Sequence, residues 1–172
     1  MFRTSNSLTP AIVTVVTCLS VMARLAGAGQ SNAPTACALL SQDEIQQAVG
    51  AVINSGEHRL AIESASACRF PMVGGGLITV VVRRPDRPDW ISEQIARMAS
   101  NPQHFHEVSS IGDRSFLFDM AGKGAALCTF HAGHYIQVSA FGVAQPSRLL
   151  PALVALGEKV LTRFEILPQT NG

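Results

Sequence analysis

The N-terminal segment most limits what this chain can fold into, because it has the pattern of a cleavable export signal. An apolar run, residues 11–22, follows a start that carries Arg3 and no acidic residue. Such a run is too short to cross a bilayer, and Ala26 and Ala28 supply the small residues that suit signal peptidase. We therefore expect residues 1–28 to be a signal peptide, which leaves 144 of the 172 residues to fold.

Two alternatives keep the protein attached to a membrane. In the first alternative, the N-terminal segment is not cleaved and serves as a membrane anchor, although Arg24 interrupts the apolar stretch early. The second is a lipoprotein modified at Cys18, where residues 15–18 resemble a lipobox, but Thr17 is larger than the usual residue. Cys37 is a poorer candidate because of the proline three residues before it. We expect a periplasmic or secreted bacterial protein, with a membrane-anchored lipoprotein as the alternative and membrane contact only if a lipid or the signal is retained.

The composition of the mature chain limits its partners. The signal takes two of the 13 basic residues, so 11 basic and 12 acidic residues remain and the net charge is near −1. This balance, with no basic stripe, excludes nucleic acid as an expected partner. The length suits one domain with a core. We expect a flexible segment over 29–36, a single domain over 37–166 and a tail over 167–172.

Local patterns predict an alternation of helices and strands. Ser41 and Glu44 have the spacing of a capping box, which predicts a helix that ends at Gly50. Asp89 is expected to cap a second helix. A third begins near Ser147. The expected strands are 60–63, 67–72, 77–83, 108–111, 115–118, 125–131 and 134–140, the last two forming a hairpin.

This order of elements, α-βββ-α-βββ-α, predicts the fold class. Strands that occur in runs with short connections favour an antiparallel sheet. We therefore predict an α+β domain with an antiparallel sheet of about six strands and with helices packed on one face.

Short motifs at three places resemble a known class of proteins. Residues 37–44 read Cys-Ala-Leu-Leu-Ser-Gln-Asp-Glu, 68–70 read Cys-Arg-Phe, and 112–116 read Gly-Asp-Arg-Ser-Phe. They resemble small bacterial exported proteins and lipoproteins of unknown function with a Cys-x-Leu-Leu-[Ser/Thr]-x-x-Glu helix, a Cys-x-aromatic strand and a Gly-Asp-x-[Ala/Ser]-Phe turn. The resemblance spans most of residues 37–164. It implies export, an α+β fold and a Cys37–Cys68 disulfide, and it supplies no catalytic residues.

Three cysteines remain after processing: Cys37, Cys68 and Cys128. In an oxidising compartment two of the three normally pair, and the residues alone leave the pairing open. The pairing implied by the resemblance closes a loop of about thirty residues and stabilises by roughly 3 kcal/mol in the chain-entropy model. Cys128 is then an unpaired, buried thiol. The alternative is a Cys68–Cys128 bridge.

Histidines near Cys128 raise two chemical hypotheses. The spacing of Cys128, His131 and His134 resembles that of metal ligands. However, residues 128 and 131 of an extended strand point to opposite faces, so we expect no metal and no cofactor and keep His131 and His134 only as weak candidates. A Cys128 nucleophile with a histidine base is the second hypothesis, a small thiol-dependent or hydrolytic enzyme.

The function we predict is a binding role. The sequence contains no nucleophile elbow, zinc-peptidase motif or phosphate loop, so we expect no catalytic residues. The leading prediction is an exported cell-envelope domain with a non-enzymatic binding or accessory role, whose partner is an envelope protein or a small ligand. Arg83, Arg84 and Arg87 are the candidate contacts for a ligand or anion.

Overall fold

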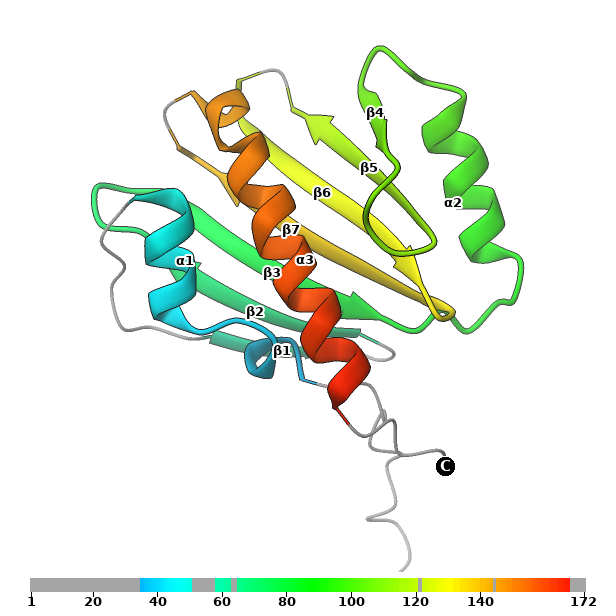
Figure 1. Cartoon of the computed structure of the whole chain (residues 1–172), viewed down its shortest axis with the longest axis horizontal. Coiled ribbons are helices and arrows are strands. Elements are labelled where there is room, and N and C mark those ends of the chain that lie inside the picture. The colour runs from blue at the N-terminus through cyan, green and yellow to red at the C-terminus, as the bar shows by residue number, and fades with distance from the viewer. Residues whose placement is uncertain (1–34, 51–57, 63–64, 121, 144, 168–172) are drawn as a thin grey trace, which may run out of the picture. The chain divides into compact units, whose positions relative to one another are not determined.

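The structure is a computed structural model (Figure 1). The residues that it describes are 35–50, 58–62, 65–120, 122–143 and 145–167. The expected signal peptide, 1–28, therefore lies outside the described residues, as do the flexible segment up to residue 34 and the tail from residue 168. Among the described helices, none combines the length and the apolar character that crossing a bilayer requires.

The described residues form three α-helices, two short 3-10 helices and seven strands. In chain order these are η1 (Ala36–Ala38), α1 (Gln42–Val49), β1 (His58–Ile62), β2 (Ala65–Pro71), β3 (Leu77–Arg83), α2 (Trp90–Ala99), β4 (Phe105–Val108), β5 (Arg114–Asp119), β6 (Gly124–His131), β7 (His134–Phe141), η2 (Pro146–Leu149) and α3 (Leu150–Ile166).

All strands belong to one antiparallel sheet with the order β1-β2-β3-β7-β6-β5-β4. The α+β class and the antiparallel sheet are confirmed, and the sheet has seven strands where about six were expected. The hairpin of β6 and β7 is central, because β7 pairs with β3 and β6 pairs with β5. Two segments far apart in the sequence thus meet at the middle of the sheet.

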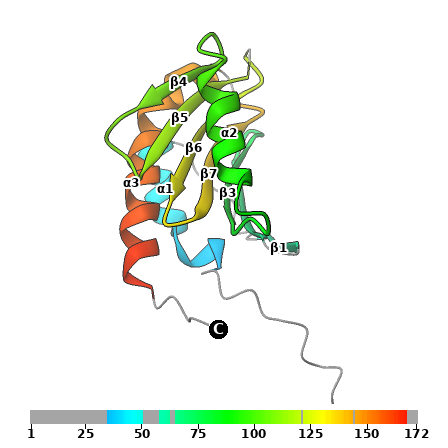
Figure 2. The same cartoon turned by 90° about the vertical axis from the view of Figure 1, so that its right-hand side faces the viewer.

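The prediction that the helices pack on one face holds for α1 and α3 but is wrong for α2. Figure 2 shows α2 on the other side of the sheet from α1 and α3. The reason lies in β6, where seven of the eight residues are buried. Leu127 joins the core under α1 and α3, whereas Ala126 and Phe130 join the cluster under α2. A strand that is apolar on both faces needs cover on both.

A disulfide joins Cys37 to Cys68 and ties η1 to β2. The pairing implied by the resemblance is therefore confirmed, and the alternative Cys68–Cys128 is wrong. Cys68 packs in the core under α1 and α3, whereas Cys128 is a free, buried thiol in the cluster under α2, on the opposite face. Ala36 is fully buried and its amide donates to Ser66 Oγ at 2.8 Å, so ordered structure begins inside the segment expected to be flexible.

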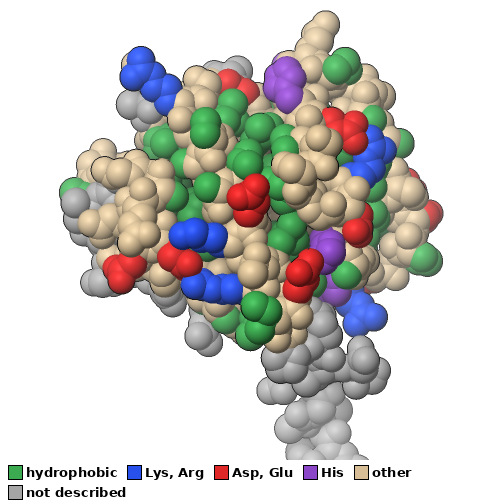
Figure 3. All heavy atoms as spheres, viewed as in Figure 1, with side chains coloured by type: hydrophobic (Ala, Val, Ile, Leu, Met, Phe, Trp, Pro, Cys, Tyr) green, Lys and Arg blue, Asp and Glu red, His purple; other side chains and the backbone are tan. Residues whose placement is uncertain are grey.

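Charged side chains join α1 to α3. The capping box is present, because Ser41 Oγ accepts from the Glu44 amide and Glu44 accepts from the Ser41 amide. The same Glu44 carboxylate accepts two hydrogen bonds from Arg163, at 2.6 and 2.7 Å. Figure 3 shows that charged side chains of both signs are interspersed on this face of the molecule. One carboxylate thus caps α1 and fastens it to α3.

The close packing of α3 on the sheet gives a test of the core. A Cβ atom built at Gly157 would lie 2.2 Å from Leu127 Cδ2, and Leu127 is itself buried. We expect Gly157→Ala to lower the free energy of unfolding by about 1–3 kcal/mol despite alanine's better helix propensity. Urea unfolding measures this loss. In a Leu127→Ala background the same change should cost less, and an equal cost in both backgrounds would contradict the contact.

The pH dependence of stability tests the Glu44 contacts. Burial alone would raise the pKa of Glu44, but hydrogen bonds from the Ser41 amide and Arg163 lower the pKa below its ordinary value of 4.5. A lowered pKa in the folded state contributes stability above the ordinary pKa, and this stability is lost as the pH falls through the folded-state pKa.

We therefore expect Glu44→Gln to cost about 1–2 kcal/mol of unfolding free energy at neutral pH. The difference from the parent protein should shrink below a pH of about 4. Asp43→Asn is the matched control, because Asp43 is exposed in the same helical turn and should give a smaller change. Urea unfolding over a pH series measures both. A Glu44→Gln cost that stays constant with pH would contradict the assignment.

Candidate functional site

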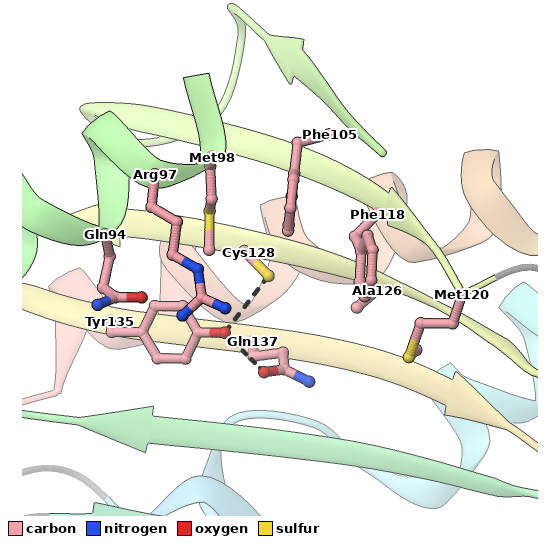
Figure 4. Close-up of a pocket in the computed structure, with 10 residues that line it drawn as sticks. All are labelled: Gln94, Arg97, Met98, Phe105, Phe118, Met120, Ala126, Cys128, Tyr135 and Gln137. Carbon is pink, nitrogen blue, oxygen red and sulfur yellow. Dashed lines mark hydrogen bonds between the residues drawn. The ribbon is translucent and has the colours of Figure 1, made fainter. Parts of the chain in front are cut away.

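A cavity of about 240 Å³ lies between α2 and the sheet (Figure 4). The strand register explains how the cavity forms. Alternate side chains on each strand point towards α2. Phe105 pairs with Phe118, and Phe118 pairs with Ala126, so these three lie side by side on that face. Cys128 pairs with Gln137 next to them. The cavity therefore draws its lining from β4, β5, β6, β7 and α2.

The walls of the cavity are apolar. The rings of Phe105 and Phe118 stack with centroids 4.6 Å apart, and both side chains are half-buried. Met98 of α2 and Met120 after β5 complete the walls, and Ala126 supplies a small floor residue. Methionine side chains adapt their shape readily, so these walls suit an apolar group of variable shape.

The polar part of the floor is a chain of three groups. The Tyr135 hydroxyl lies 2.6 Å from Gln137 Oε1 and 3.3 Å from Cys128 Sγ. A hydroxyl has only one proton to donate, and we assign it to the shorter contact, in which Tyr135 donates to Gln137 Oε1. Cys128 Sγ is the more distant acceptor within reach of the same hydroxyl. Figure 4 shows the three side chains in this arrangement.

Both titratable groups of the floor keep their protons near neutral pH. Burial raises the pKa of the Cys128 thiol, and the hydrogen bond with Tyr135 offsets this only in part. Burial also raises the pKa of Tyr135, and the neighbouring Cys128 raises it further. The floor therefore offers neutral hydrogen-bonding groups rather than a thiolate.

Arg97 supplies a positive charge at the edge of the cavity. It comes from the exposed side of α2, and Figure 4 shows its guanidinium group on the side of the cavity where Tyr135 lies. Among the described residues that line the cavity there is no carboxylate, and no ion pair joins Arg97 to an acidic side chain within this part of the chain. The cavity thus has a cation without a matching anion.

A second hollow, of about 380 Å³, continues the cavity past the end of α2. The two share Arg97, Phe105, Phe118 and Met120, and the outer hollow adds Asn101, His104 and Asp119. Together they form a groove that runs from Tyr135 to the C-terminal end of α2. The aromatic wall of Phe105 and Phe118 is common to both parts.

The structure does not bring Cys128 and a histidine together. No histidine lines the cavity in the described part of the chain, and His131 and His134 belong to the other side of the β6–β7 hairpin. His131 lies against Phe164 of α3, as does His134. The pair that the thiol-enzyme hypothesis needs is therefore not assembled here.

His131 and His134 instead line a separate hollow of about 560 Å³ with Arg84 and Glu165. His131 lies between two carboxylates, 3.4 Å from Asp113 and 3.2 Å from Glu165. Burial lowers the pKa of His134, and the nearby Arg84 contributes in the same direction, although a bond to the Ala132 carbonyl opposes them. Within the described residues no group of three or more His, Cys, Asp or Glu side chains is placed to hold a metal ion.

The three arginines predicted to contact a ligand do not form one cluster. Arg83 lies over the ring of Trp90, with 4.8 Å from Cζ to the ring centroid. Arg87 forms ion pairs with Asp89 and Glu93 on the exposed side of α2. Arg84 lines the hollow that contains His131 and His134. The cation of the α2 cavity is Arg97, which the sequence reasoning missed because a single arginine on a helix has no distinctive pattern.

Comparison with known proteins adds no relative. The chain matches no family model, no curated protein and no solved structure. The functional interpretation therefore depends on the geometry of the described residues.

The protection of Cys128 can be measured directly. We expect iodoacetamide to modify Cys128 much more slowly in the native protein than in urea, because the thiol is 4% exposed and burial raises its pKa. Mass spectrometry of the peptide that contains Cys128 measures the rate, and the reduced unfolded protein is the control. Native labelling near pH 7 as fast as that of the unfolded chain would show that the thiol is accessible.

Proposed function

We propose that this chain is an exported cell-envelope domain that binds a small, largely apolar molecule in the cavity under α2 and does not act on it chemically. The cavity itself carries the proposal. Phe105 and Phe118 keep part of their surface accessible there although a tighter core would bury it. A concave apolar site with a few convergent polar groups is the usual form of a small-molecule site.

The chemistry of the lining supports binding rather than catalysis. A general base has to accept a proton near neutral pH, and the usual groups are His, Asp and Glu. Within the described lining of the cavity none of these occurs. Cys128 and Tyr135 keep their protons because burial raises the pKa of both groups. The groups that line the inner cavity can orient a ligand by hydrogen bonds, but none of them is poised to remove its proton, and His104 and Asp119 line only the outer hollow.

The compartment supports a role in the cell envelope. The Cys37–Cys68 disulfide is compatible with an oxidising compartment, where such bonds persist. Together with the signal pattern of residues 1–28, it supports a periplasmic or secreted location, with a lipoprotein as the alternative form. The resemblance to small exported bacterial proteins agrees with both. The partner is then a small ligand of the envelope, held by the domain in an accessory role.

A neutral fluorescent probe tests the binding site. We expect N-phenylnaphthylamine to gain fluorescence with the parent protein and to bind at least about tenfold more weakly to Ala126→Leu, which fills the floor of the cavity. Ala99→Leu is the matched control, because Ala99 is exposed on α2 and does not line the cavity.

The experiment includes a check of folding, and two of its outcomes would overturn the proposed site. Thermal unfolding checks that each variant is folded, and Ala126→Val replaces Ala126→Leu if the larger side chain is not accommodated. Absence of any probe binding to the parent protein would overturn the proposed site. Equal binding by the parent protein and by both Ala126 variants would also overturn it, because the probe would then bind elsewhere.

A further inference from the structure

We infer that the ligand of the α2 cavity is an amphipathic monocarboxylate, with its carboxylate bound between Arg97 and Gln137 and its apolar chain along Phe105 and Phe118. This inference rests on the proposed function, because it names the class of ligand for the same cavity.

Charge complementarity indicates that the ligand carries a negative charge. Arg97 lines both the cavity and the outer hollow, and no carboxylate of the described residues pairs with it. The acidic residue in the groove is Asp119, which lines only the outer hollow. Attraction to Arg97 favours an anionic group, and repulsion from Asp119 in the outer hollow places that group at the inner end of the groove.

The hydrogen-bonding groups at the inner end of the groove also favour a negatively charged ligand. The Gln137 carbonyl oxygen accepts from Tyr135, so the Gln137 amide nitrogen keeps both of its protons for another partner. Figure 4 shows this nitrogen turned away from the Tyr135 hydroxyl. Arg97 offers only donors as well. A group with several acceptor atoms, such as a carboxylate, therefore fits between the two.

The count of cations favours a carboxylate over a phosphate ester. Arg97 is the one Lys or Arg among the described residues that line the cavity, so the site balances one negative charge. A phosphate monoester carries between one and two negative charges near neutral pH and is commonly bound by clusters of basic groups. The walls beyond Arg97 are aromatic and methionine side chains, which suit an alkyl or aryl chain.

Ligands with a common chain and different head groups test the inference. Isothermal titration calorimetry with the folded protein would compare octanoate, octanol, octylamine and octyl phosphate. We expect octanoate to bind about tenfold or more tightly than octanol, because a charge-assisted hydrogen bond adds that order of affinity. Octylamine should bind more weakly than octanol, and octyl phosphate should not exceed octanoate.

Two arginine variants show whether Arg97 is responsible. Arg97→Gln should remove the preference for octanoate over octanol. Arg87→Gln makes the same change of net charge in the connection just before the same helix, but Arg87 pairs with Asp89 and Glu93 outside the cavity, so the octanoate preference should persist. An equal loss in both variants would overturn the assignment in favour of a general charge effect.

The failure of this inference is distinguishable from failure of the proposed function. If octanol and octanoate bind the parent protein equally and Ala126→Leu weakens both, the cavity binds ligands but the carboxylate assignment is overturned. If octyl phosphate binds more tightly than octanoate, the head group is a phosphate and the assignment is again overturned. If none of the ligands binds and N-phenylnaphthylamine also fails to bind, the proposed function itself is overturned.

Discussion

The burial of β6 on both faces is the constraint on which the rest of the structure depends. A strand at the centre of an antiparallel sheet usually leaves one face to solvent, but β6 carries Leu127 on one face and Ala126 and Phe130 on the other. Each face therefore needs its own cover. The chain supplies α3, supported by α1, for the first face and α2 for the second (Figure 2). Because the second face of β6 needs cover, the chain between β3 and β4 has to form a helix, α2, although β6 comes later in the sequence.

The helices on the two faces pack against the sheet with different closeness, and this difference explains the cavity. The surface of α3 that contacts the sheet includes Gly157, whose lack of a side chain lets the helix approach Leu127 closely. Six residues of α3 are buried, whereas Met98 is the one buried residue of α2. Large aromatic rings, including Tyr135 in edge contact with Trp90, lie between α2 and the sheet. The small Ala126 beside the rings of Phe105 and Phe118 leaves unfilled space, and the cavity lies there.

Much of the fold could be predicted from local sequence, but the placement of α2 could not. The capping box at Ser41 and the β-branched run of β3 are local signals, and the predicted bounds 77–83 match the strand. The expected strand at 108–111 was placed too late, because β4 begins at Phe105 among polar residues and depends on pairing with β5. Asp89 makes no side-chain cap. The site was missed for a related reason, since Gln137 and Ala126 are brought together by sheet register and Arg97 joins them only through the packing of α2 on the sheet. The apolar residues of β6 at both alternating sets of positions were the available signal that the second face of the sheet also needed a helix.

The uneven packing of the two faces also relates stability to binding. The face under α1 and α3 is held by the disulfide, by the core and by the Glu44–Arg163 contacts, so the fold can remain stable without tight packing of α2. The α2 face is then free to keep accessible aromatic surface and an unpaired Arg97. A ligand that fills the cavity adds contacts to the loosely packed helix and stabilises the folded state in proportion to its affinity. The region that contributes least to folding is therefore the region best suited to recognition, which is the division expected when one scaffold has to serve both purposes.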